Sequence, residues 1–522
     1  MKKTILALMA FLPILGMAQE RIMVVADPHV LPQSLIAEGS EEFDAMMAKQ
    51  RKMLDLSEAA WIAMMDTALK YQPSLLLIPG DLTKDSEKAS HELVANSLRA
   101  LEEANIKTFV IPGNHDIGGN AYRYEGTQKI PVDNLPDEEW ESTYSWIYDS
   151  VVAKDPSSHS YVAEPLEGLS ILGIDGAHNT AGTGWLSDET LAWILAQADS
   201  ACAKGNTIIA MCHWQILEHF DMQGSLESAC RLKNADAIRD SLMHHGMRLL
   251  LTGHFHVNGI TTFRDTTSLT NDSIVEITTG SPITYPCPYR WLTLSADRTQ
   301  VQVQTDDIMA LATQPDLLPY SREWMRIHTQ NMIPEMTLRA WRKVDENLDK
   351  VAPYVSYIGV TYEDIKAAMP QTDSAKIALT NKYFGSTIVD LYLVHSEANE
   401  ALNPKSDSLA TELYNGIAGM ITEICNSSLN PALIMAGMFL SPLAQELARP
   451  IVQSMVEDIN LYGTDYANRT DDLHLTLRIN DQNEQAIEAI GENTIDAQKI
   501  ILDGQLFIRN GDDLYTPQGQ RL

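Results

Sequence analysis

Gly113-Asn114-His115-Asp116 follows the short apolar segment 108–111, and it is the stretch from which the fold of this 522-residue chain is best predicted. The apolar segment is expected to be a buried strand that ends at Pro112, and Gly113 permits a tight turn after it. The next three side chains are all of types that bind metals or transfer protons. A purely structural turn rarely needs Asn, His and Asp in succession, so this turn indicates a functional site.

Four more predicted strands end in polar residues of the same kinds. These strands are residues 21–26, 75–78, 206–211 and 248–251, and helices are predicted between most of them. The polar residues that follow them are Asp27 and His29, Asp81, His213, and His254 and His256. Alternating strands and helices are typical of a layered α/β domain, where ligands bind beyond the carboxyl ends of the strands. We therefore expect all these residues to converge.

The side chains at the five strand ends have the chemistry of a paired metal site. Carboxylate, imidazole and amide groups without thiolate suit ions such as Mn, Fe or Zn. Two Asp, four His and one Asn are enough to hold two ions that share one carboxylate. Two ions roughly 3.5–4 Å apart can stabilise the attacking and leaving oxygens of a displacement at phosphorus. Asp81 alone would be an ordinary turn residue and His213 alone a core histidine, but five such coincidences favour the metal site.

The same residues form an ordered set of motifs. The pattern D-x-H, G-D, G-N-H-[DE], H and G-H-x-H is present as Asp27-Pro28-His29, Gly80-Asp81, Gly113-Asn114-His115-Asp116, His213 and Gly253-His254-Phe255-His256. With these motifs, residues 21–305 resemble an exported bacterial calcineurin-like metallophosphoesterase. The resemblance implies an α/β fold, a four-layer α/β/β/α sandwich, followed here by a mostly helical C-terminal domain. Pro28 and Val30 are unusual neighbours of the first motif and leave its ligands intact.

The resemblance also implies a role for each motif residue. One metal would be held by Asp27, His29 and His256, and the other by Asn114, His213 and His254, with Asp81 bridging them. His115 would act as general acid or donate to the phosphoryl oxygen, and Asp116 would orient its ring.

The implied activity is hydrolysis of a small phosphate ester by metal-bound hydroxide, with a phosphodiester favoured over a monoester. A phosphomonoesterase or pyrophosphatase on the same site stays open, as does a metal-stabilised binding module without turnover. The intact pair of His115 and Asp116 argues against the binding module, because a pure binder needs no proton donor. Metal identity and oligomeric state are not predicted.

Residues 1–18 have the features of a signal peptide, with Lys2 and Lys3 before the apolar segment 5–15 and small residues at 16–18. The chain is therefore expected to be exported, to the periplasm or outside the cell, with no transmembrane segment after cleavage. A net charge of −32 argues against nucleic acid as a general partner. Five cysteines are an odd and small number, which argues against a disulfide framework and leaves a single disulfide open. Cys212 is expected to face the core.

The pattern changes near residue 305, so the predicted parts are 1–18, a catalytic domain at 19–305 and a domain of unknown role at 306–522. Residues 317–462 have helical periodicity, and 473–479 and 505–509 are predicted strands. The apolar run 431–444 is broken at Ser441 and Pro442, so we expect a buried helix too short to cross a bilayer. Its expected core residues are Leu433, Ile434, Met435, Met438, Phe439 and Leu440.

Two questions of function stay open in the sequence. The C-terminal part could form a wall of the active site or stand apart as a partner-binding module. Residues 117–137 are expected to be a loop, in which Tyr122, Arg123 and Tyr124 either contact a substrate phosphate or are solvated.

Overall fold

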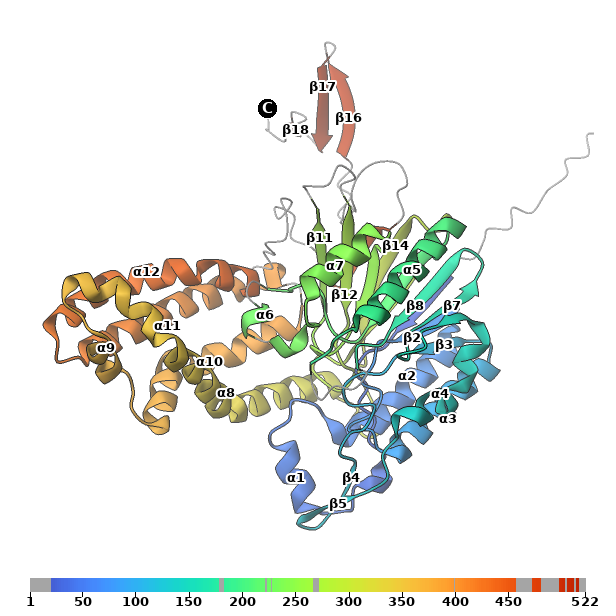
Figure 1. The fold of residues 1–522 in the computed structure, drawn as a ribbon, viewed down its shortest axis with the longest axis horizontal. Helices are drawn as coiled ribbons and strands as arrows, with labels where there is room; N and C mark the ends of the chain where they lie inside the picture. The colour runs from blue at the N-terminus through green and yellow to red at the C-terminus, as the bar shows by residue number, and fades with distance from the viewer. Residues whose placement is uncertain are drawn as a thin grey trace, which may run out of the picture.

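Two β-sheets packed face to face form the centre of the molecule, and helices cover their outer faces (Figure 1). The computed structural model describes residues 20–177, 183–220, 223–226, 228–265, 272–398, 400–456, 472–479, 497–502, 505–510 and 513–515. The predicted signal peptide at 1–18 lies outside these residues. The predicted four-layer α/β/β/α sandwich is confirmed, and so is the largely helical C-terminal part.

The first sheet has six strands in the order β15-β14-β13-β1-β2-β3. They are β1 (Glu20–Val24), β2 (Leu75–Ile78), β3 (Lys107–Val110), β13 (Pro288–Leu294), β14 (Gln300–Asp307) and β15 (His474–Arg478). β1, β2 and β3 are parallel, so their carboxyl ends lie at one edge of the sheet. All four residues of β2 are buried, as its unbroken apolar sequence predicts for a central strand.

The second sheet has seven strands in the order β11-β12-β10-β9-β8-β7-β6. They are β6 (Val151–Lys154), β7 (Tyr161–Leu166), β8 (Leu169–Ile174), β9 (Thr207–Cys212), β10 (Leu249–Thr252), β11 (Gly259–Arg264) and β12 (Ser273–Thr278). β8, β9, β10 and β12 are parallel. One core joins the sheets through residues such as Leu76, Phe109, Ile171 and Leu251, and Cys212 is buried as predicted.

Helices complete the four layers. α2 (Ser57–Tyr71) and α3 (Lys88–Glu103) pack on the first sheet, and α5 (Asp188–Lys204) and α7 (Ala235–His244) pack on the second. The sequence indicates where α5 begins and ends, because Ser187 accepts a hydrogen bond from Thr190 N and Gly205 ends the helix in the left-handed conformation. Two short helices, α4 (Trp140–Thr143) and α6 (Gln223–Leu226), lie in connections.

The segment expected to be a loop, 117–137, contains the hairpin β4 (Tyr122–Glu125) and β5 (Gln128–Pro131), so that expectation is wrong. Tyr124 is buried against Phe43 of α1 (Glu41–Met47). Arg123 forms an exposed ion pair with Glu125. These contacts give the residues a structural role in the hairpin.

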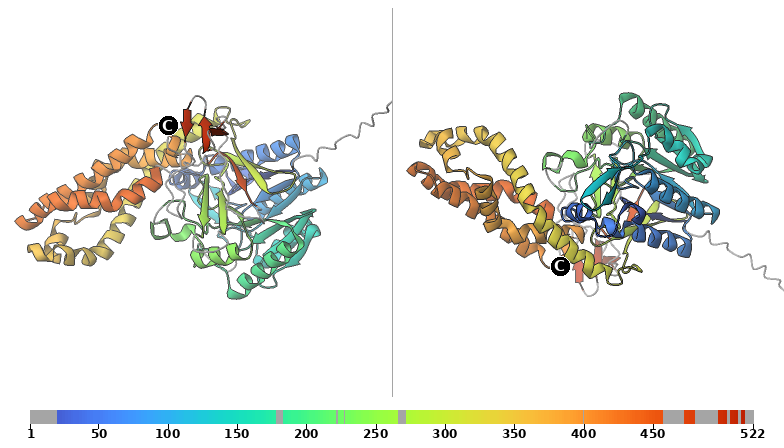
Figure 2. Two further views of the ribbon diagram at one scale, coloured as in Figure 1. Left: turned by 90° about the horizontal axis from the view of Figure 1, so that it is seen from above. Right: turned by 90° about the horizontal axis from the view of Figure 1, so that it is seen from below.

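The C-terminal helices extend from the sandwich as an arm, which Figures 1 and 2 show from three sides. The arm consists of α8 (Leu317–Val355), α9 (Tyr362–Ala368), α10 (Asp373–Ser396), α11 (Ser406–Asn426) and α12 (Pro431–Val456). At its base, Tyr285 of the sandwich packs with Met325 of α8 and with Val389 and Leu393 of α10. The arm is therefore attached to the sandwich by an apolar cluster.

α12 contradicts the expectation of a buried helix. Leu433 is buried, but Met435, Met438 and Phe439 are 61%, 68% and 73% exposed, and Ile434 is 39% exposed. Ser441 and Pro442 lie inside α12, so the helix continues past the point where the run was expected to break. Among the described residues, α12 alone is long and apolar enough to cross a membrane by length and composition, a property that core helices share.

The chain after residue 305 also returns to the sandwich. β14 continues to Asp307, and β15 pairs with it antiparallel, with Leu475 opposite Val303. Leu475, Leu477 and Ile479 belong to the core between the sheets. The C-terminal part thus completes the first sheet. A separate small sheet contains β16 (Ala497–Leu502), β17 (Gln505–Asn510) and β18 (Asp513–Tyr515), so both late strands are confirmed.

Candidate metal centre

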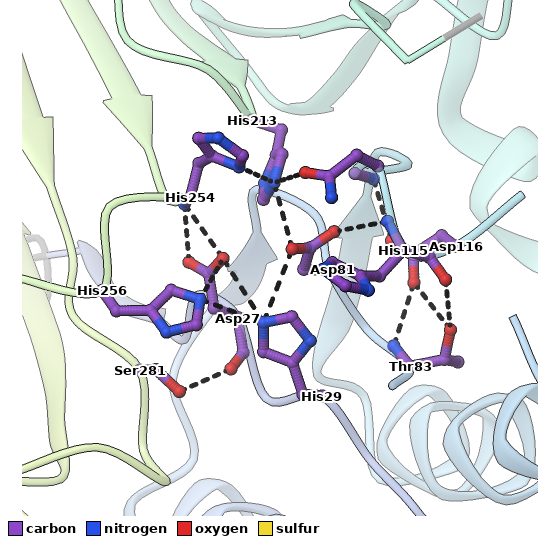
Figure 3. A network of polar contacts seen from close by, with 12 residues as sticks. Asp27, His29, Asp81, Thr83, His115, Asp116, His213, His254, His256 and Ser281 are labelled. Atoms are coloured by element: carbon purple, nitrogen blue, oxygen red, sulfur yellow. Dashed lines mark hydrogen bonds and ion pairs between the residues drawn. The ribbon is translucent and has the colours of Figure 1, made fainter. Parts of the chain in front are cut away.

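The residues predicted to bind metal come together at one place between the two sheets (Figure 3). They follow the carboxyl ends of β1, β2 and β3 in the first sheet and of β9 and β10 in the second. They are Asp27, His29, Asp81, Asn114, His213, His254 and His256. Because both sheets end their parallel strands at the same side, residues up to 229 positions apart become neighbours.

The first group consists of Asp27, His29, Asp81 and His256, whose candidate ligand atoms all lie within 4.8 Å of one another. The Nε2 atoms of His29 and His256 are 3.0 Å apart. His256 Nε2 lies 3.3 Å from Asp27 Oδ1, and His29 Nε2 lies 3.5 Å from Asp81 Oδ2.

The second group consists of Asp81, His213 and His254. His213 Nε2 is 3.3 Å from Asp81 Oδ2 and 3.1 Å from His254 Nδ1. Asn114 Oδ1 lies 3.2 Å from the same His213 Nε2, which places the amide oxygen at this group. Asp81 belongs to both groups, so the structure has the arrangement that a shared carboxylate requires.

The donor atoms fit metal ions. His213 Nδ1 bonds to the carbonyl of Pro79 and His254 Nε2 to that of Ala229. If each of these nitrogens carries the ring proton, the facing nitrogens offer lone pairs to an ion. His29 Nδ1 is buried without a partner among the described residues, while its Nε2 faces the centre. The oxygen and nitrogen donors suit hard to borderline divalent ions and do not identify one.

The local backbone is unusual at five of these residues. Asp27, His29, Asp81, His254 and His256 have φ values of 51°, 41°, 51°, 67° and 59°, in the left-handed region that non-glycine residues rarely adopt. Hydrogen bonds hold the loops in place, since His254 N donates to both carboxylate oxygens of Asp27 at 2.9 Å.

Two motif glycines are needed for close approach. A Cβ on Gly113 would collide with the Asp81 carboxylate, and one on Gly253 would collide with that of Asp27. Gly113 does not have a positive φ, so glycine is required there for space and not for a left-handed backbone.

Burial controls the charge of the imidazoles. It lowers the pKa of His29 well below the usual value, and the positive charge of Lys52 adds to the shift. Burial and His213 lower the pKa of His254 to about 3. Neutral rings are the form that binds metal. At His213, burial is outweighed by the Asp81 carboxylate, which raises the pKa to about 9, so a metal there would compete with this proton.

His115 lies beside the centre, with its side chain 30% exposed. Its backbone N donates to Asp81 Oδ1 at 2.9 Å, and its Nδ1 lies 2.8 Å from Asp85 Oδ1. Asp85 also pairs with Lys84. Burial favours the neutral acid of Asp85, but the hydrogen bond from His115 and the charge of Lys84 outweigh it and lower the pKa.

Asp116 does not orient the ring of His115, so that expectation is wrong. Its carboxylate accepts hydrogen bonds from Thr83 N and Oγ1 at 2.9 and 3.0 Å and from Gly113 N at 2.8 Å. It therefore ties the loop after β2 to the loop after β3. Burial and the nearby Asp81 raise its pKa to about 7. The ring partner of His115 is Asp85.

Sequence reasoning missed two residues at the centre, Asp85 and Lys52. Lys52 lies in the loop between α1 and α2 and interacts electrostatically with Asp81, Asp85 and Asp27. The signal that could have found it is the cluster Lys49-Gln50-Arg51-Lys52, which is strongly basic in a chain of net charge −32.

The part of the chain that carries the centre matches a known family. Residues 20–258 match the family model described as calcineurin-like phosphoesterase. Among solved structures, the chain is similar to a dimetal phosphatase from Danio rerio, at 13% identity and a TM-score of 0.39, covering 55% of this chain and 95% of that one. It is also similar to the purple acid phosphatase PPD1 from yellow lupin, at 12% identity and a TM-score of 0.35, covering 56% and 52%. No curated protein matches this chain.

Proposed function

Since residues 20–258 belong to the calcineurin-like phosphoesterase family, we propose that the chain hydrolyses a small phosphodiester after export from the cytoplasm. Membership of this family makes the chain a metal-dependent phosphoric ester hydrolase. The observation that carries the proposal is the place of Asp81, whose carboxylate belongs to both ligand groups. A single-ion site would not need two groups of ligands around one shared carboxylate.

The ligand residues divide between two ions. Asp27, His29 and His256 would hold one, Asn114, His213 and His254 the other, and Asp81 both. When bound, such ions supply Lewis-acid stabilisation of negative charge and lower the pKa of water. The left-handed loops and the hydrogen bonds from His254 N and His115 N hold the carboxylates of Asp27 and Asp81 in place.

His115 would transfer a proton to the leaving alcohol. Its ring is partly exposed beside the ligands, where an ester can reach it, and its Nδ1 is held by Asp85. A fixed ring keeps the other nitrogen directed at one place, which a general acid requires. A metal-stabilised binding module would not need this hydrogen-bonded pair.

The openness of this side favours a diester. The side chains of His115 and His256 are 30% and 19% exposed, while Asp27 and His29 are fully buried. The exposed side of the centre is therefore the side of His115 and His256, from which both ester groups of a diester would extend into solvent. A phosphomonoester or pyrophosphate is the second candidate, and Lys52 favours it because a dianionic phosphoryl group gains more from an added cation.

We also propose that residues 1–18 direct export to the periplasm or the cell exterior. The proposal rests on the order of charged, apolar and small residues at 1–18. Amino-terminal sequencing of protein recovered from an exporting bacterial host tests it. A first residue other than Gln19 in the exported protein, or retention in the cytoplasm, would contradict it.

Hydrolysis of a chromogenic diester and monoester tests the function. The full chain is freed of metal, loaded separately with Mn, Fe, Zn or Ni, and assayed at equal metal content. We expect turnover that needs two ions per chain and is faster for the diester. Faster monoester turnover would select the second candidate, and no turnover with any loaded ion would select the binding module. Asp137→Asn, a change at a partly exposed residue outside the centre, serves as the control.

A further inference from the structure

Lys52 is a cation at the metal centre that has no partner of its own. It is half-buried, and no acceptor lies within hydrogen-bond or ion-pair distance of its ammonium group among the residues that the structure describes. Its neighbour Met53 bonds to Ile283, and the segment 281–284 reaches the centre, where Ser281 Oγ donates to the carbonyl of Asp27 at 2.7 Å and Thr284 Oγ1 to that of His256 at 3.5 Å. In keeping with this place, the charges of Asp81, Asp85 and Asp27 act on Lys52, and its own charge acts on His29 and His256. Lys84, a buried lysine nearby, is paired with Asp85.

The charge of this lysine is costly unless an anion lies beside it. Two divalent ions held by the seven ligand residues would repel the ammonium group of Lys52. Asp27 and Asp81, which attract it, would then be occupied by the ions. An anion between the ions and Lys52 removes this repulsion, and the anion that a phosphoesterase brings there is the phosphoryl group of its substrate or product.

The loop that carries Lys52 is held from both parts of the molecule. Met53 N donates to the carbonyl of Ile283 at 2.8 Å in the sandwich. From the arm, Asn331 of α8 donates to the carbonyl of Ala48 at 3.3 Å, and Tyr392 of α10 lies 4.4 Å from the guanidinium of Arg51. Residues 48–53 are therefore clamped at both ends, with Lys52 between the contacts.

We propose that Lys52 binds the non-bridging phosphoryl oxygen of the substrate and that the C-terminal arm positions it through residues 48–53. The inference rests on the proposed function and adds a substrate-binding residue outside the matched motifs. It also gives the arm a role in the site. An ammonium group is a strong donor to phosphate oxygens, and charge-assisted hydrogen bonds are the strong ones.

Binding of inorganic phosphate to the metal-loaded full chain tests the proposal without turnover. Lys52→Met is compared with the wild type by calorimetry, and metal content is measured by elemental analysis. We expect two ions per chain in both proteins and phosphate affinity lower by roughly 10- to 100-fold in the variant. Lys52→Arg should recover part of the loss, because it keeps the charge.

Lys49→Met is the matched control, since Lys49 is an exposed lysine in the same loop. It should bind phosphate like the wild type. In Tyr392→Leu, the loss of the cation–π contact should weaken phosphate binding by roughly 2- to 5-fold. An unchanged affinity there would overturn the role of the arm.

Unchanged phosphate affinity in Lys52→Met with both ions bound would overturn the proposal, and so would metal loss in that variant. If Lys52→Met fails to fold, acylation of wild-type lysines decides, because phosphate should protect Lys52 and not Lys49 from the reagent. Equal protection would overturn the proposal. If the wild type hydrolyses no ester but Lys52 still governs phosphate binding, the hydrolytic function falls and this inference stands.

Discussion

Replacing Asp85 by Asn tests how much the orientation of the His115 ring contributes to the rate, while His115 itself stays able to transfer a proton. The change keeps the size of the side chain and removes the negative charge opposite His115 Nδ1. The hydrogen bond at 2.8 Å is charge-assisted, a type that contributes about 1.5–3 kcal/mol when buried. Both side chains are 30% exposed, so solvent screening reduces this to about 1–1.5 kcal/mol.

The expected result is a fall in kcat of about 5- to 13-fold, since each 1.36 kcal/mol is a factor of ten. Replacing His115 itself by Ala should cost about 10²–10⁴-fold, the usual contribution of a positioned acid. Both variants should keep their metals. Both losses should shrink for esters with good leaving groups, which need little protonation. The assay is steady-state hydrolysis of esters with leaving groups of graded pKa, with metal content measured alongside.

Lys84→Met is the control, because Asp85 also pairs with the buried Lys84. If Asp85 acts only by neutralising Lys84, Lys84→Met should keep the wild-type rate, and adding it to Asp85→Asn should restore that rate. If Asp85 orients His115, the double variant should keep the rate loss of Asp85→Asn. A loss in Asp85→Asn as large as that in His115→Ala would refute the reasoning, as would no loss with a poor leaving group. Metal loss in His115→Ala would make His115 a ligand.

Three further predictions concern the centre and the core. Asp81→Ala should lose both ions and all activity together, because its carboxylate belongs to both ligand groups, and full metal occupancy by elemental analysis would contradict the shared site. Leu477→Ala should lower the free energy of unfolding by about 2–5 kcal/mol in urea titrations, because β15 completes the first sheet and Leu477 is 1% exposed in the core. The control Leu447→Ala, at an exposed leucine, should lower it far less. Burial lowers the pKa of His91 to about 4, below its unfolded value of about 6.5, so the folded state binds fewer protons than the unfolded state between these pH values. The free energy of unfolding should therefore fall as pH falls from about 6.5 to about 4, by about 3 kcal/mol at most. Urea unfolding of metal-free protein across this range should have a shallower pH dependence in His91→Gln, and equal slopes would show that His91 is not responsible.

The strand ends of the centre were predictable because each strand is a short apolar run that stops at a turn signal. Residues 75–78 are an example, with all four side chains buried and Gly80-Asp81 following. The hairpin at 122–131 was not predictable in this way. Its strands carry Arg123, Glu125, Gln128 and Lys129, so only one face is apolar and the alternation is too short to recognise.

Tertiary contacts decided what the sequence could not. Asp116 adjoins His115 in the chain, but the turn directs its carboxylate to Thr83, and Asp85 from the neighbouring loop meets the ring instead. The apolar residues of α12 predicted burial. Apolar side chains favour burial, but their presence does not determine whether another element packs over them. The pairing of β15 with β14 joins residues about 170 positions apart, which no local pattern specifies.

The left-handed backbone of the five ligand residues creates a trade-off between robustness and catalysis. A non-glycine residue in this conformation costs about 1 kcal/mol or more, and glycine would relieve that cost at each of Asp27, His29, Asp81, His254 and His256. Every one of those replacements also removes a metal ligand. Bound ions stabilise the folded state, so it is selection on the metal-free protein that would favour changes that remove these ligands. A search for a hardier enzyme should therefore hold these five positions constant and vary the sandwich and the arm.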